Sequence, residues 1–120
     1  MRVDKMVAAT VAALEDIKGR DIVVLDVRRM TALFDKLVVV SGDSTRQNKA
    51  LASNVQEKLK ALGATVHGVE GTDGGEWILV DLGAVVVHIM QPAIRQYYNL
   101  EELWRGAAVP TARRAAGARA

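Results

Sequence analysis

The 120-residue sequence contains no cysteine and only two histidines, two prolines and five aromatic residues. The lack of cysteine excludes thiol nucleophiles, disulfides, iron–sulfur ligation and cysteine-based zinc sites. A metal site built on His67 and His88 would need added carboxylates, and no spacing in the sequence provides them. The sequence therefore predicts neither a metal nor any other cofactor.

Long apolar runs and targeting segments are also missing. Runs such as Ala84–Val87 are far too short to cross a membrane. Residues 1–10 include Asp4 and lack a continuous apolar stretch, so they resemble neither a secretory signal nor an organellar transit peptide. We therefore expect a cytoplasmic protein that does not contact membranes.

The net charge of +2 comes from the C-terminal end of the chain. Residues 106–120 hold three arginines and no acid, whereas residues 1–105 hold 13 basic and 14 acidic residues. A near-neutral body argues against a protein that binds mainly phosphate backbones. We predict one folded domain over residues 1–105 and a basic, alanine-rich, disordered tail over 106–120, with any direct RNA contact minor and confined to this tail.

The hydrophobic pattern predicts an α/β fold. In chain order it indicates a helix over 3–18, strands over 22–27 and 37–40, a helix over 45–62, strands over 65–69, 76–82 and 85–90, and a short helix over 100–105. Ser44 and Gln47 have the spacing of a capping box at the start of the long helix. The strands flanking that helix should run parallel and the last two should form a hairpin, which predicts a single domain with a mixed sheet of about five strands and flanking helices.

The hairpin residues sort into two faces, because side chains alternate along a strand. With an even-numbered loop, one face is aliphatic: Ile78, Val80, Leu82, Val85, Val87 and Ile89. The other face is mixed: Trp77, Leu79, Asp81, Val86, His88 and Met90. Either a second helix packs on this mixed face, with its polar residues at the margin, or the face binds a partner.

Four of the five aromatic residues lie between Trp77 and Trp104. The Tyr97–Tyr98 pair with Arg95 nearby has the composition of an interface hot spot, although Tyr97 and Trp104 would equally serve to pin a final helix onto the sheet. The predicted partner-binding residues are Trp77, Leu79, Asp81, His88, Met90, Arg95 and Tyr98.

Catalytic patterns are weak. Ser41-Gly42-Asp43-Ser44 lies between a strand and a helix, where anions bind in α/β folds, but it is no Walker loop and Asp43 would repel a phosphate. Asp81 and His88 are close enough across the hairpin to interact diagonally, which favours a buried polar pair over a catalytic relay. The alternative is a divergent nucleotidyltransferase-like enzyme that uses Ser41, Gly42 and a lone aspartate, although two-metal transfer needs paired carboxylates.

Five motifs together carry a resemblance to a known family. They are Leu25-Asp26-Val27, Ser41-Gly42, Ser44-x-Arg46-Gln47, Glu76-Trp77-x-Leu79-x-Asp81-x-Gly83 and Tyr98-x-Leu100-Glu101-x-Leu103-Trp104. In this order and spacing, over roughly residues 4–105, the sequence resembles the ribosomal silencing factor (Iojap-like) family, and the missing transit peptide favours a bacterial member.

The resemblance implies a topology like that of nucleotidyltransferases, without their activity. It also implies binding to the large ribosomal subunit through its ribosomal protein fourteen. Docking there would block joining of the small subunit and repress translation when nutrients are scarce. Members of the family are typically homodimers when free, so the resemblance implies a homodimer here.

Overall fold

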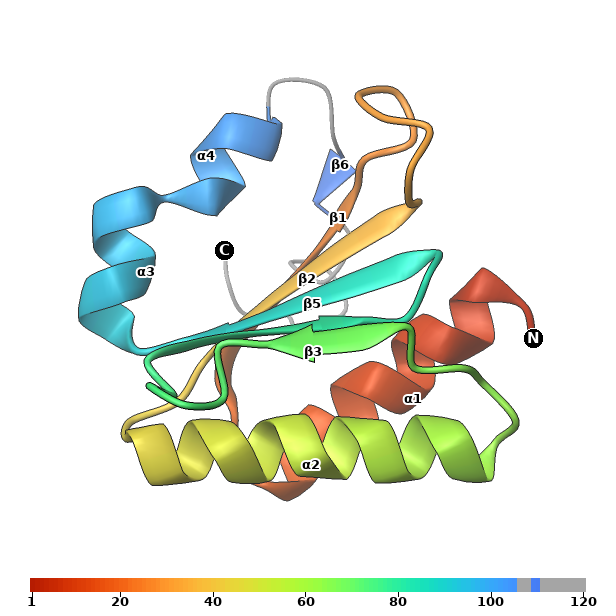
Figure 1. Ribbon diagram of the computed structural model, residues 1–120. Coiled ribbons are helices and arrows are strands. Elements are labelled where there is room, and N and C mark those ends of the chain that lie inside the picture. Colours follow the sequence, from red (N-terminus) through yellow and green to blue (C-terminus); the bar gives the residue numbers. More distant parts are fainter. Residues whose placement is uncertain (106–108, 111–120) are drawn as a thin grey trace.

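The structure is a computed structural model that describes residues 1–105 and 109–110. Within these residues a single six-stranded sheet carries helices on both faces (Figure 1). In chain order the elements are α1 (Val3–Asp16), β1 (Arg20–Asp26), β2 (Lys36–Ser41), α2 (Thr45–Ala61), β3 (Gly68–Glu70), β4 (Trp77–Asp81), β5 (Val85–Met90), α3 (Pro92–Tyr98), α4 (Leu100–Arg105) and β6 (Val109–Pro110).

The sheet is mixed, as predicted. Its strands lie in the order β3-β4-β5-β2-β1-β6, and only β2 and β5 pair in parallel. Strands β2 and β3, which flank α2, run in the same direction as expected, but β5 and β4 lie between them. The crossover through α2 therefore places β3 at the sheet edge, three strands from β2.

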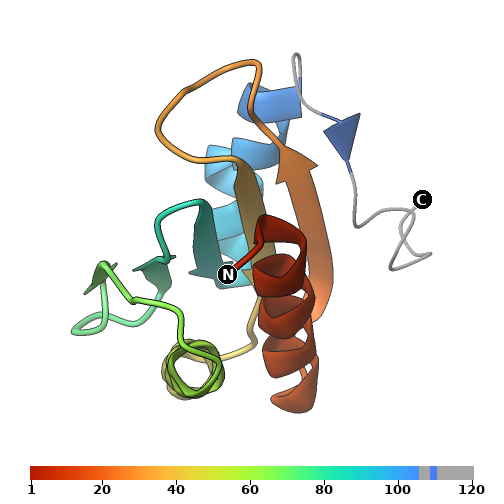
Figure 2. The ribbon, with the colours of Figure 1, turned by 90° about the vertical axis from the view of Figure 1, so that its right-hand side faces the viewer.

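Helices α1 and α2 lie against one face of the sheet, and Figure 2 views α2 along its axis beside α1. Leu14 of α1 and Leu51, Val55 and Leu59 of α2 are completely buried against this face. The spacing of these three α2 residues is the apolar stripe that the sequence predicts. No helix among the described residues is long and apolar enough to cross a membrane.

The hairpin has the register predicted from its even-numbered loop. Ile78 pairs with Ile89 and Val80 with Val87, and all four side chains are buried beneath α1 and α2. The register is determined because a slip of one residue would move this aliphatic set to the opposite face.

Helices α3 and α4 cover part of the mixed face. Ile94, Leu100 and Trp104 pack there against a second core cluster that includes Val86 and Met90. Helix α4 was predicted from the sequence, but α3 was not, because Pro92 was interpreted only as the end of a strand. Proline is favoured in the first helical turn, where its missing N–H needs no partner.

The boundaries of α1, α2, β1, β2 and β4 differ from the sequence prediction by one or two residues, and the start of β3 differs by three. Strand β3 occupies Gly68–Glu70 instead of 65–69, because the ladder with β4 pairs Gly68 with Asp81 and Glu70 with Leu79. Within the predicted tail, Val109–Pro110 form β6 and pair with Leu25 and Asp26 of β1, while the disorder of residues 106–120 stays a prediction. The remaining tail residues, 106–108 and 111–120, lie outside the described part of the chain.

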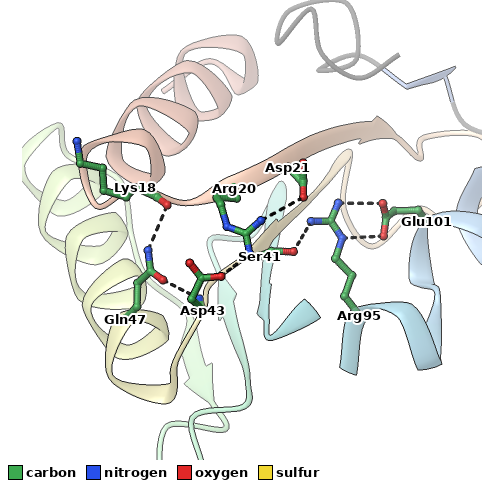
Figure 3. Close-up of polar contacts among 8 residues, drawn as sticks. All are labelled: Lys18, Arg20, Asp21, Ser41, Asp43, Gln47, Arg95 and Glu101. Carbon is green, nitrogen blue, oxygen red and sulfur yellow. Dashed lines mark hydrogen bonds and ion pairs between the residues drawn. The ribbon is translucent and has the colours of Figure 1, made fainter. Parts of the chain in front are cut away.

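Ser44 caps α2 as predicted. Its Oγ accepts a hydrogen bond from the Gln47 backbone N–H at 3.0 Å. The Gln47 side chain accepts from Asp43 N–H and donates to the carbonyls of Ile17 and Lys18, which joins the start of α2 to the end of α1 (Figure 3 shows the Lys18 and Asp43 bonds).

Ser44→Ala should therefore lower the free energy of unfolding by about 1 kcal/mol, because one helix N–H loses its acceptor. Urea denaturation of the variant and the wild type measures this difference. Large-subunit binding by the folded variant should stay at the wild-type level. An unchanged fold with abolished binding would instead place Ser44 in the interaction surface.

Candidate functional site

A cluster of aromatic rings lies where β4 begins and α3 ends. The Trp77 indole Nε1–H donates a hydrogen bond to Nδ1 of His88 at 2.9 Å, across the β4–β5 pair. The Trp77 ring centroid lies 4.8 Å from that of Tyr98, and Tyr98 in turn lies 5.0 Å from Tyr97 in an edge-on arrangement. We call Trp77, Leu79, His88, Tyr97 and Tyr98 the aromatic face.

The fold leaves this aromatic face partly uncovered. Tyr97 and Tyr98 are 81% and 53% exposed, and Trp77, Leu79 and His88 are half-buried. Trp104, by contrast, packs on Phe34 with ring centroids 5.6 Å apart and pins α4 to the sheet. Large aromatic side chains that stay accessible beside a filled core are typical of protein interaction surfaces.

Two predicted partner-binding residues lie beneath this surface. Met90 is completely buried under α3 and α4, and Arg95 is only 9% exposed. Neither side chain is available to a partner in this structure, so both support the aromatic face from below. Arg95 was predicted at an interface because the neighbouring residues Tyr97 and Tyr98 are aromatic.

Arg95 is the centre of a buried polar network. Its guanidinium forms a bidentate pair with Glu101 of α4, at 3.0 Å and 2.9 Å, and donates to Ser41 Oγ at the end of β2 at 2.9 Å (Figure 3). This network joins α3 and α4 to β2. Sequence reasoning missed Glu101 and Ser41 as partners, since the six-residue separation of Arg95 and Glu101 matches no helical contact and Asn99 breaks the helix between them with a φ of 49°.

The predicted contact between Asp81 and His88 is wrong. Asp81 Oδ1 accepts from the backbone N–H of Gly83 at 2.8 Å, in the turn between β4 and β5, while His88 accepts from Trp77. The β4–β5 register places the two residues diagonally, as expected, with Asp81 opposite Val86 and His88 opposite Leu79, but each side chain is hydrogen-bonded to another group. Asp81 is half-buried at the far end of the same sheet face, and its carboxylate forms no ion pair with the side chains that the structure describes in residues 1–104.

Burial lowers the pKa of His88 to about 4, so the imidazole is neutral at pH 7. An unfolded histidine has a pKa near 6.5, so the unfolded state binds more protons in the window between these values. The free energy of unfolding should therefore fall as pH falls through this window, by up to about 1.4 kcal/mol per pH unit. Urea titrations of the wild type and His88→Gln across the window measure the effect, since a parallel decline of both would contradict it.

The Ser41-Gly42 segment packs tightly against α2 and against Arg95. A Cβ placed on Gly42 would lie 1.9 Å from Asn48 Oδ1, and the Ser41 hydroxyl is bonded to Arg95. The pocket beside Ser41 is lined by two carboxylates, Asp21 and Glu101, against the single cation Arg95. Its negative balance is unsuited to a nucleotide triphosphate.

The carboxylates needed for two-metal chemistry do not come together either. Asp26 is bonded to the Arg28 guanidinium, which holds the pKa of Asp26 well below its usual range. No group of three or more histidine or acidic side chains within residues 1–105 could hold a metal ion.

Comparisons with known proteins agree on one family. A family model described as "Ribosomal silencing factor during starvation" matches residues 1–119. The chain is 52% identical to the ribosomal silencing factor RsfS of Chromobacterium violaceum over 106 residues, which cover 88% of this chain and 87% of that protein. It is 39% identical to RsfS of Bacillus subtilis over 93 residues, or 78% of this chain and 79% of that protein.

Solved structures agree with this result. The crystal structure of protein CV0518 from C. violaceum superposes with a TM-score of 0.85 at 52% identity and covers 87% of each chain. A Bacillus halodurans structure gives a TM-score of 0.78 at 31% identity, covering 88% of this chain and 97% of that one. The matched fold and the identity over most of both chains show that this protein belongs to the ribosomal silencing factor family, as a bacterial member.

Proposed function

We propose that this protein binds the large ribosomal subunit through ribosomal protein fourteen of that subunit and blocks joining of the small subunit. The bound body occupies space that the small subunit requires, so translation falls when nutrients are scarce. This mechanism is steric and needs no catalysis or cofactor; its strength is set by affinity and concentration. We place the protein in the cytoplasm, as a homodimer when it is free of the ribosome.

The aromatic face carries this proposal. Helices α3 and α4 cover part of its sheet face, yet the rings of Trp77 and Tyr98 stay accessible and are held in place by His88 and the Arg95 network. A preorganised aromatic anchor is the feature that interface hot spots share. Asp81, on the same face, supplies a carboxylate for a lysine or arginine of a basic ribosomal protein.

Sedimentation of the protein with separated ribosomal subunits tests the proposal. We expect co-sedimentation with large subunits, and a loss of joined ribosomes when small subunits are then added. Binding to small subunits alone, or to neither subunit, would overturn the proposal. Sedimentation equilibrium of the free protein tests the homodimer separately.

The negative charge of Asp81 should strengthen binding of the protein to the large ribosomal subunit. Asp81→Lys should abolish large-subunit binding, because it places a cation against a basic partner. Asp81→Asn is the matched control, since its side-chain oxygen still accepts from Gly83 N–H while the charge is lost; it should bind more weakly than the wild type but still measurably. A folded Asp81→Lys protein that blocks subunit joining at wild-type concentrations would exclude this face as the contact site.

A further inference from the structure

Charge is strongly segregated within the domain. Residues 62–94 contain four acidic residues and no lysine or arginine, whereas α2 contains four basic residues and one acid. The near-neutral net charge of residues 1–105 therefore conceals an acidic β3–β4 side and a basic helix. Such a distribution fits two partners of opposite charge better than one uniform partner.

The cations of α2 gather on its outer side. Arg46, Lys49 and Lys60 are all exposed, and Ser53 lies between them on the same side of the helix. None of the three forms an ion pair with the part of the chain that the structure describes, whereas Lys58 pairs with Asp16 at 3.0 Å. We call Arg46, Lys49 and Lys60 the basic stripe.

Arg46 does not stabilise the fold, unlike its neighbours in the Ser44-x-Arg46-Gln47 motif. Ser44 caps α2, and Gln47 joins α2 to the end of α1. Arg46 is exposed and makes none of these contacts. Its position in the first turn of a helix is one where a carboxylate, not a guanidinium, would be favoured, so neither packing nor helix stability accounts for this arginine.

The N-terminal end of the basic stripe lies close to the turn that precedes Trp77. A Cβ placed on Gly75 would lie 2.9 Å from Thr45 Cβ and 3.1 Å from Lys49 Cε, so the first turns of α2 pack on the turn that leads into Trp77. The N-terminal end of α2 therefore lies near the start of β4, while the Trp77 side chain packs on the opposite face of the sheet. Figure 1 shows α2 on the other side of the sheet from α3 and α4.

We infer that the basic stripe binds the phosphodiester backbone of ribosomal RNA next to the protein partner of the aromatic face. This inference rests on the proposed function, which places the protein on a surface made of RNA and protein. Unpaired guanidinium and ammonium groups neutralise phosphates and release their counterions, without reading base sequence. The acidic β3–β4 side would then face basic protein, and α2 would face RNA.

The salt dependence of large-subunit binding tests the inference. Arg46→Glu/Lys49→Glu is the test variant, and its fold should be preserved because acidic residues are favourable near a helix N-terminus. Lys5→Glu/Arg29→Glu is the matched control, since both residues are exposed and the charge change is the same. The slope of log Kd against log salt should become shallower by about 1.5 for the test variant, with binding at least ~10-fold weaker at low salt. The control should match the wild type.

A photo-crosslinking residue in place of Ser53 identifies what the stripe meets. We expect crosslinks to ribosomal RNA in the protein–large-subunit complex. Crosslinks to ribosomal protein alone, or a test variant with wild-type affinity and salt slope, would overturn the inference and leave the proposed function intact. Wild-type protein that does not sediment with large subunits at any salt concentration would overturn both.

Discussion

Trp77→Ala should weaken binding to the large ribosomal subunit by about 2 kcal/mol or more, which is roughly 30-fold in Kd. Trp77 is the only tryptophan of the aromatic face, and its ring contacts both His88 and Tyr98. Truncation removes the apolar anchor and also leaves the His88 Nδ1 acceptor without its donor. Titration of large subunits with labelled protein measures the loss.

The other tryptophan of the chain provides the control. Trp104 packs on Phe34 in the second core cluster and lies outside the aromatic face. Trp104→Ala should lower the free energy of unfolding at least as much as Trp77→Ala, yet bind with wild-type affinity at a temperature where both variants are folded. Equal losses of binding in the two variants would show that stability, not contact, governs the effect.

Trp77→Phe separates the two roles of the side chain. Phenylalanine keeps a ring against Tyr98 but has no N–H for His88, so the variant should lose about 1 kcal/mol of stability and retain most of the affinity. Binding as weak as that of Trp77→Ala would place the importance of Trp77 in its hydrogen bond.

Arg95→Ala should be the most destabilising single substitution considered, lowering the free energy of unfolding by about 3–5 kcal/mol. The Glu101 carboxylate would remain largely buried without its guanidinium, and Ser41 Oγ would lose a donor. Because Tyr98 lies on the same helix as Arg95, the loss of the guanidinium should also shift Tyr98 and so alter the aromatic face. Urea denaturation measures the first effect, and large-subunit binding measures the second.

The double variant Arg95→Met/Glu101→Leu is the comparison for Arg95→Ala. Removing both charges avoids a buried, unpaired carboxylate, and such replacements are often neutral or stabilising. We therefore expect the double variant to recover most of the stability lost in Arg95→Ala. A loss below about 1 kcal/mol for Arg95→Ala would show that water solvates Glu101 and that the pair does not hold α3 and α4 in place.

Elements with local signals could be predicted from the amino-acid sequence alone. The Ser44 cap, the buried stripe of α2 and the two faces of the hairpin all follow from spacings within one element or one turn. The even loop after Asp81 was enough to place Trp77 and His88 on one face opposite the aliphatic residues, because strand side chains alternate with a fixed period. The family also follows from the sequence, since its motifs span most of the domain.

The accessibility of those residues depends on how the helices pack on the sheet. Arg95 and Met90 share the predicted region with Trp77 and Tyr98, but α3 and α4 bury the first two and leave the others partly open. The Arg95 network joins β2, α3 and α4. Asp81 and His88 are hydrogen-bonded to Gly83 and Trp77 and not to each other. No spacing along the chain encodes these contacts, because they depend on how separate elements pack in space, and packing decides whether a side chain supports a surface or belongs to it.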